Sequence, residues 1–257
     1  MLQRRFRHIG NANSLFYSEP LHIVRGEDVW LYDAEGKKYL DVYNNVAHVG
    51  HSNPYVVEAI TKQAKTLNTN TRYLHENIID LAEKITNLMP GELGVCYFVC
   101  SGSEANDLAL QIARTYTRKK GCLVSENAYH GNTTAVFQMS PEDCAPKTRQ
   151  DWVQVLPGLK KYQQTDQAEL NYLKDLSFAM DNLDDIDVGT AAVIFDSIFS
   201  SDGIFLPPLG YLKTIFGAVR ASGGLAIADE VQSGLGRTGS YMWGFSHDGV
   251  VPDIVTL

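Results

Sequence analysis

Leu225-Ala-Ile-Ala-Asp-Glu-Val-Gln232 sets four apolar residues directly before two acids. A short apolar run of this kind is typical of a strand that is buried on both faces, as in a parallel sheet. Comparable runs lie at residues 95–99, 123–124, 191–195 and 254–257. Amphipathic patterns over Glu104–Tyr116 and Tyr211–Ala221 separate several of these runs and predict helices. The alternation predicts an α/β fold, in which helices cover both faces of a mostly parallel central sheet.

The N-terminal part of the chain has a different pattern. The runs Val29–Asp33 and Lys37–Val42 flank Ala34-Glu-Gly36 and predict a β-hairpin with glycine at its turn. Helices are predicted after the hairpin, over residues 54–64 and 77–89.

Length and patterning together suggest the domain organisation. A chain of 257 residues fits one large domain or two small ones. We expect an N-terminal segment over residues 1–50 and a large domain over residues 51–257. Within the large domain, residues 140–187 are polar and predict loops and a peripheral helix.

Composition excludes several classes of partner. Thirty acids against 22 Lys plus Arg give a net charge of −8, which disfavours binding to nucleic acids or anionic membranes. No apolar run approaches the ~18 residues of a membrane span, and the basic start Met1–His8 lacks the apolar core of a secretory signal. The four cysteines fit neither a zinc nor a disulfide pattern, so we expect buried, reduced thiols in a cytoplasmic protein. The spacing His48-Val-Gly-His51 contains a turn-forming glycine and has no acid close by, so we expect no metal site.

Chemistry-bearing residues follow several apolar runs, where ligands bind in open α/β sheets. Ser101-Gly-Ser-Glu-Ala-Asn106 reads as a capping box that starts a helix, and its free N–H groups suit a phosphate equally well. Tyr129-His-Gly131 offers an aromatic face for a flat ring, although loop aromatics more often only pack. Asp229 and Glu230 end their strand at the ligand rim, where a carboxylate can hold a protonated ring nitrogen or merely cap a helix. Gly234–Gly239 matches GxGxxG, but it lies five residues beyond its strand and predicts no dinucleotide site.

Taken together, these motifs resemble the class III (ornithine/omega-type) aminotransferases, a family of pyridoxal-phosphate (PLP) enzymes. Their order and approximate spacing match over almost the whole chain, including Pro252-Asp-Ile-Val-Thr-Leu257. Asn45–His51 and Leu67–His75 look most like the branch typified by ethanolamine-phosphate phospho-lyase. The resemblance implies the PLP-dependent transferase fold of type I.

The resemblance also implies roles for five residues around the cofactor. Gly102 and Ser103 would hold the phosphate, Tyr129 would stack on the pyridine ring, and His130 would lie nearby. Asp229 would keep the ring nitrogen protonated, so that the ring can accept electrons from the substrate. Asp229 and Tyr129 are thus the expected catalytic residues.

Four further positions follow from the resemblance. Gln232 would contact the ring hydroxyl, and Asp196 would support the cofactor although the family usually has Glu-Pro where this chain has Asp-Ser. Asn45 and Arg72 are candidates for contact with substrate. A substrate phosphate would need a cation such as Arg72, whereas surface solvation is the alternative role for any single arginine.

The family pattern continues beyond the last residue of this chain. In the family, Asp-Ile-Val-Thr-Leu is followed almost at once by a Gly-Lys pair whose lysine forms the Schiff base. We therefore expect a fragment that stops just before this lysine, lacks the C-terminal small domain and is inactive alone.

Three functions are compatible with these motifs. The first is transfer of an amino group between a primary amine or amino acid and a 2-oxo acid or aldehyde, by a homodimer. The alternatives are elimination of phosphate and ammonia from a phosphorylated amine, and a non-catalytic truncated remnant.

Overall fold

The computed structural model describes residues 1–12, 15–43, 46–162 and 167–257. Contacts divide the chain into two compact units, Met1–Leu74 and His75–Leu257. The expected domains at residues 1–50 and 51–257 stay a prediction.

The first unit contains a small antiparallel sheet and two helices. Its elements are α1 (Leu2–Ile9), β1 (Ile23–Glu27), β2 (Trp30–Asp33), β3 (Lys38–Leu40) and α2 (Pro54–Thr66), and the strand order is β1-β2-β3. Trp30 pairs with Leu40, which confirms the hairpin. The turn is held by the carboxylate of Asp33, which accepts hydrogen bonds from the Lys37 N–H (2.7 Å) and the Tyr39 hydroxyl (2.7 Å).

Two details of this unit differ from expectation. β1 has no apolar alternation, since its sequence is Ile-Val-Arg-Gly-Glu, and it was not predicted. His51 does have an acidic partner, because its Nε2 lies 2.7 Å from Oδ2 of Asp41.

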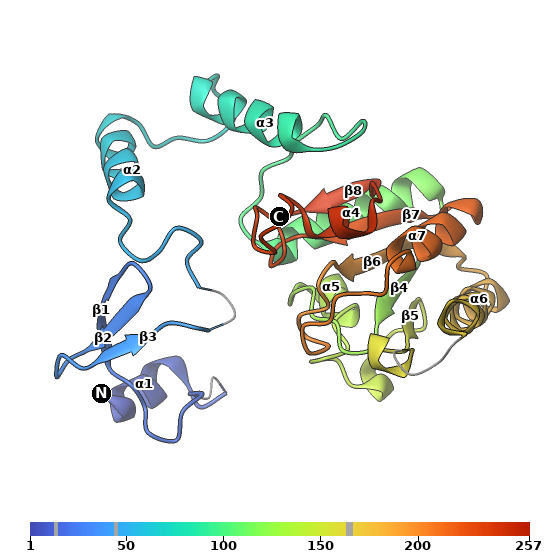
Figure 1. Ribbon diagram of the computed structural model, residues 1–257, viewed down its shortest axis with the longest axis horizontal. Coiled ribbons are helices and arrows are strands. Elements are labelled where there is room, and N and C mark those ends of the chain that lie inside the picture. Colours follow the sequence, from blue (N-terminus) through green and yellow to red (C-terminus); the bar gives the residue numbers. More distant parts are fainter. Residues whose placement is uncertain (13–14, 44–45, 163–166) are drawn as a thin grey trace. The chain divides into compact units, whose positions relative to one another are not determined.

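The second unit is built on a five-stranded parallel sheet (Figure 1). Its strands are β4 (Gly121–Ser125), β5 (Val153–Leu156), β6 (Thr190–Asp196), β7 (Leu225–Asp229) and β8 (Ile254–Thr256), in the order β5-β4-β6-β7-β8. The central strands are almost wholly buried, as the continuous apolar runs predict. The α/β fold with a mostly parallel sheet is therefore confirmed.

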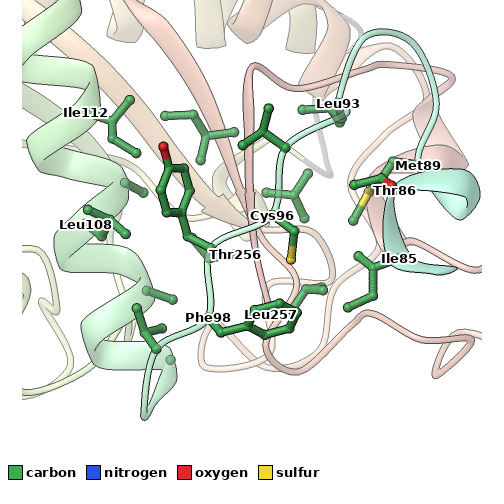
Figure 2. Close-up of a pocket in the computed structure, with 18 of the residues that line it drawn as sticks. Ile85, Thr86, Met89, Leu93, Cys96, Phe98, Leu108, Ile112, Thr256 and Leu257 are labelled. Carbon is green, nitrogen blue, oxygen red and sulfur yellow. The ribbon is translucent and has the colours of Figure 1, made fainter. Parts of the chain in front are cut away.

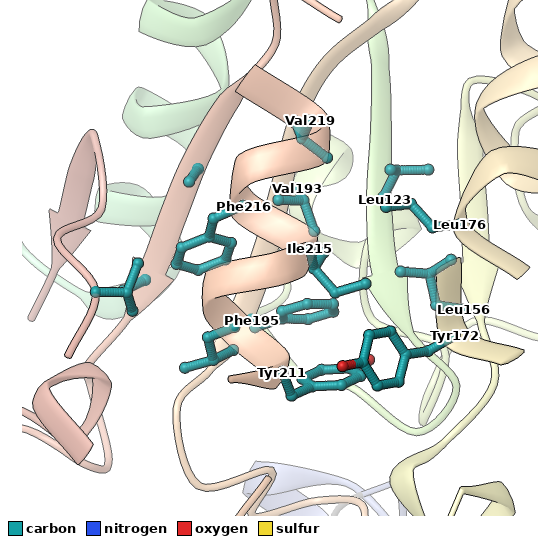
Figure 3. Close-up of a cluster of buried hydrophobic side chains, with 14 of the residues drawn as sticks. Leu123, Leu156, Tyr172, Leu176, Val193, Phe195, Tyr211, Ile215, Phe216 and Val219 are labelled. Atoms are coloured by element: carbon teal, nitrogen blue, oxygen red, sulfur yellow. The ribbon is translucent and has the colours of Figure 1, made fainter. Parts of the chain in front are cut away.

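Helices cover both faces of this sheet. The helices of this unit are α3 (Glu76–Leu88), α4 (Gly102–Thr117), α5 (Thr134–Gln138), α6 (Ala168–Asp185) and α7 (Tyr211–Ala221), with 3-10 turns η1 (Pro146–Thr148), η2 (Leu159–Lys161) and η3 (Gly244–Asp248). Of these, α4, α6 and α7 contact the strands directly, whereas α3 has no buried residue. Successive strand residues point to opposite faces. Val193 and Phe195 therefore pack in one core with α6 and α7, including Phe216 (Figure 3), while Ala192 and Ile194 pack in a second core with α4.

The polar stretch at residues 140–187 is better ordered than its composition suggests. It contains β5, which the sequence pattern missed because Gln154 interrupts a run of only four residues. It also contains α6, whose Tyr172 and Leu176 are buried in the main core. The expected helix is therefore present as α6, but its expected peripheral position is wrong, because α6 packs directly on the sheet.

Residues 95–99 correct a second expectation. They do not belong to any strand of the described residues, although their apolar run predicts one. They line a cavity of about 530 Å³ together with β8, α4 and the end of α3 (Figure 2). An apolar run identifies a segment that can be buried, but a strand also requires a neighbouring backbone to pair with.

The structure also shows which cysteines are buried and whether any described helix could cross a membrane. All four cysteines are free, as expected. Cys122 and Cys144 are buried, but Cys100 is exposed and Cys96 is intermediate, so the expectation of burial is wrong for Cys100. Within the described ranges, no helix is both long and apolar enough to span a bilayer.

Candidate active site

The side chain of Asp229 is the centre of a buried hydrogen-bond network. It ends β7 and is only 5% exposed. Its Oδ2 lies 2.7 Å from His130 Nδ1 and accepts a hydrogen bond of 2.8 Å from Asn106 Nδ2. Its Oδ1 accepts a hydrogen bond of 3.1 Å from the Val231 N–H. Two segments far from Asp229 in the sequence, at Asn106 and His130, therefore hold this carboxylate together with its own neighbour Val231.

The start of α4 forms one wall of the site. Ser101 is the N-cap, and its Oγ accepts a hydrogen bond of 3.2 Å from the Glu104 N–H. Glu104 Oε2 accepts one of 2.7 Å from the Cys100 N–H, one residue before the cap. The expected capping interaction is confirmed, with its reciprocal bond shifted by a residue. The N–H groups of Gly102 and Ser103 point out of the helix start, because first-turn amides have no acceptor within their helix.

Two glycines allow the segments of the site to approach closely. A Cβ on Gly102 would lie 2.8 Å from Val231 Cγ2, and a Cβ on Gly131 would lie 2.2 Å from Ser103 Oγ. The start of α4, the loop after β4 and the end of β7 therefore meet at one place. The Ser103 hydroxyl also hydrogen-bonds with Asn132, which the sequence analysis did not single out.

Asp196 lies beside Asp229, because β6 and β7 pair with these two residues in register. Its carboxylate accepts hydrogen bonds from the N–H groups of Ile198 (3.1 Å) and Ser200 (2.8 Å). Burial raises the pKa of Asp196, and the charge of Asp229 adds to the rise. The acid thus holds the turn after β6 while facing a second acid.

Glu230 is a buried acid whose role the sequence analysis did not predict. It is 2% exposed and accepts hydrogen bonds from Ser197 Oγ (2.5 Å) and from the N–H groups of Gly244 (2.6 Å) and Phe245 (3.0 Å). Burial raises the pKa of Glu230 above its ordinary value. The side chain ties the ends of β6 and β7 to the turn η3.

The remaining predicted site residues differ in how exposed their side chains are. Tyr129 is 43% exposed, whereas His130 is 3% exposed and its Nε2 is buried without a partner among the described residues. Gln232 is partly buried next to Val231. Asn45 lies outside the described residues, and Arg72 is exposed in the first unit.

The sequence analysis quoted Asn106 and Thr256 only as parts of longer motifs and assigned neither of them a role in the site. Both are buried polar side chains, 1% and 4% exposed, and Thr256 Oγ1 donates a hydrogen bond of 2.7 Å to Asn106 Oδ1. Asn106 stands in the motif that the sequence analysis quoted, and a polar residue on the buried face of a helix was the available signal.

The parallel sheet and its helices form the fold of the PLP-dependent transferases of type I. The family profile of the class III aminotransferases matches residues 15–257, and the chain belongs to that family. Class III aminotransferases use pyridoxal 5′-phosphate.

Several individual proteins are similar to this chain. An alanine–glyoxylate aminotransferase 2-like protein of Drosophila melanogaster is 42% identical over 100% of this chain and 54% of its own length. Ethanolamine-phosphate phospho-lyase homolog 1 of Caenorhabditis elegans is 38% identical over 100% of this chain and 59% of its own length. A phospholyase from Arthrobacter, solved in complex with phosphoethanolamine, is 42% identical with a TM-score of 0.94, over 99% of this chain and 61% of that chain. The chain thus spans little more than half the length of the curated relatives it matches.

Proposed function

We propose that this chain forms the cofactor-binding part of a class III enzyme that transfers an amino group between a primary amine or amino acid and a 2-oxo acid or aldehyde. One observation carries the proposal. The carboxylate of Asp229 and the glycine-lined start of α4 lie at the same end of the sheet, joined by Asn106. A cation and an anion on one small molecule can therefore be held at once.

The residues present fit pyridoxal phosphate. A Cβ at position 102 would collide with Val231, so glycine is the residue that fits there. The backbone of Gly102 carries no side chain that would keep a ligand away, and its first-turn N–H group suits an anion. Tyr129 lies in the loop after β4, at the same end of the sheet. Its ring is partly exposed, which suits stacking on a flat heterocycle. The orphaned Nε2 of His130 gives the site a further unused polar group.

The proposed roles of the residues follow from these positions. Gly102 and Ser103 would bind the phosphate through backbone N–H groups. The cofactor supplies an electron sink for the substrate carbon that loses a group. Asp229 would hold a proton at the ring nitrogen through Oδ1, which has one donor partner, the Val231 N–H, whereas Oδ2 has two. Gln232 would contact the ring hydroxyl.

Asp196 would act differently from the other acids. Its oxygens accept hydrogen bonds from its own turn, so it would support the wall of the site rather than contact the cofactor. Its burial next to Asp229 places two acids at one rim.

Binding of the cofactor tests this proposal directly. Titration of the chain with pyridoxal phosphate, followed by quenching of tryptophan fluorescence, should give saturable binding that Asp229→Ala weakens by about tenfold or more, as loss of a charge-assisted contact predicts. Equal binding by both proteins would refute the assignment of Asp229.

A phospho-lyase activity is the second candidate. The similarity to the Arthrobacter phospholyase with bound phosphoethanolamine favours it. In that case Arg72 and Asn45 are the proposed substrate contacts, and Arg72 would supply the cation for a phosphate. Product analysis with the full-length protein separates the candidates: a new amino acid and an oxo acid indicate transfer, whereas phosphate, ammonia and an aldehyde indicate elimination.

We further propose a cytoplasmic homodimer that binds neither nucleic acid nor membrane. The net charge of −8 supports the lack of such partners. Membership of the class III aminotransferase family supports the homodimer. Sedimentation velocity of the chain should show a dimer, and a monomer at all concentrations would contradict this part.

A further inference from the structure

Asn106 uses all of its hydrogen-bonding groups to connect four segments. Its Nδ2 donates to Asp229 Oδ2 and to the backbone carbonyl of His130, both at 2.8 Å. Its Oδ1 accepts from Thr256 Oγ1 at 2.7 Å. The side chain thereby joins α4, the loop after β4, the end of β7 and β8.

The orientation of this amide is determined by its partners. A carbonyl and a carboxylate only accept hydrogen bonds, so the NH₂ group of Asn106 must face His130 and Asp229. The Oδ1 atom then faces Thr256, whose hydroxyl must donate. Asparagine alone offers two donors and an acceptor at this reach, since aspartate lacks the donors and glutamine is longer by a methylene.

We propose that Asn106 is a positioning residue that holds the Asp229 carboxylate toward the ring nitrogen of the cofactor, and that Thr256 holds Asn106. This inference rests on the proposed function. Without the Nδ2 donor, the carboxylate of Asp229 keeps only His130 at Oδ2 and the Val231 N–H at Oδ1, and it can rotate away from the position that would face the ring nitrogen. Asn106 itself touches no reacting atom in this scheme, so its loss acts through Asp229.

The consequence is a specific dependence on the ring nitrogen. A variant that misplaces Asp229 should lose affinity for pyridoxal phosphate. It should retain affinity for the 1-deaza analogue, in which carbon replaces that nitrogen, because this analogue offers nothing for Asp229 to bind. A residue that only supports packing would weaken both ligands alike.

The test compares both ligands on the chain and on three variants. Asn106→Ala removes the donor, Thr256→Val removes the hydroxyl while keeping the shape, and Thr256→Ser keeps the hydroxyl. We expect Asn106→Ala to weaken pyridoxal phosphate by about tenfold (~1.4 kcal/mol) and the analogue by less than about twofold. Thr256→Val should weaken pyridoxal phosphate by about threefold, and Thr256→Ser should bind as the parent chain does.

Each outcome decides the proposal. Equal weakening of both ligands, or no change in either, overturns the positioning role while the cofactor site stands. If Asn106→Ala does not fold, as thermal unfolding would show, the Thr256→Val and Thr256→Ser pair decides by the same criterion. A parent chain that binds neither ligand overturns both this inference and the proposed function.

Discussion

Replacement of Gly131 by alanine should be among the most damaging small changes in the second unit. Gly131 has a φ of +130°, and an added Cβ would lie 2.2 Å from Ser103 Oγ and 2.7 Å from Ser103 Cα. Backbone strain in this region costs about 1–3 kcal/mol. Overpacking against a backbone atom that cannot rotate away adds about 1–3 kcal/mol. We therefore expect Gly131→Ala to lower the free energy of unfolding by about 2–6 kcal/mol.

Gly239→Ala provides a matched control. Gly239 also has a positive φ, +86°, but no atom lies within 4 Å of an added Cβ. Only the strain remains, about 1–2 kcal/mol. Urea unfolding followed by the fluorescence of the buried Trp243 measures both variants. If Gly131→Ala is no less stable than Gly239→Ala, the close approach to Ser103 is not the constraint inferred here.

Three further predictions concern buried groups of the same unit. Asp229→Ala leaves two buried donors without an acceptor and should cost about 2–6 kcal/mol in urea unfolding, so a change below 1 kcal/mol would contradict the network. Burial raises the pKa values of Asp196 and Glu230 above their ordinary 3.8 and 4.5, so the folded chain binds these protons more tightly than the unfolded chain does. The measurement is the free energy of unfolding of the parent chain minus that of the Asp196→Asn/Glu230→Gln variant. This difference should fall as the pH rises above the two ordinary pKa values. A difference that stays constant between pH 4 and 7 would refute the effect. Phe216→Ala, at a position 1% exposed, should cost about 3–5 kcal/mol, whereas Phe178→Ala, at a position 69% exposed, should leave the urea midpoint nearly unchanged.

The main elements of the fold were predictable because their patterns are local. The apolar run at Leu225–Ala228 became β7, and the amphipathic stretch Tyr211–Ala221 became α7 with those bounds. The strand predicted at Val95–Val99 was wrong, because strand pairing depends on a neighbouring backbone and the local sequence pattern does not contain that information. β5 was missed because its apolar signal is too short to stand out.

The site was predictable as a set of motifs but not as a network. Asp229, His130 and Ser101 stood out because their residue types follow apolar runs. Asn106 did not stand out, because its role depends on hydrogen-bond partners that lie 24, 123 and 150 residues away in the sequence. Glu230 was noted only as a neighbour of Asp229, and the turn that it holds became visible only in three dimensions.

The wide sequence spacing of the Asp229 network has a consequence for biosynthesis. The network needs α4 near residue 106 and β8 near residue 256, so it cannot close until the ribosome has synthesised and released the chain as far as residue 256. Contacts of such long range form late, because the intervening chain must first lose its conformational freedom. A nascent chain that has completed β4 and β6 already has a partial sheet, but the Asp229 network is complete only after β8 has emerged.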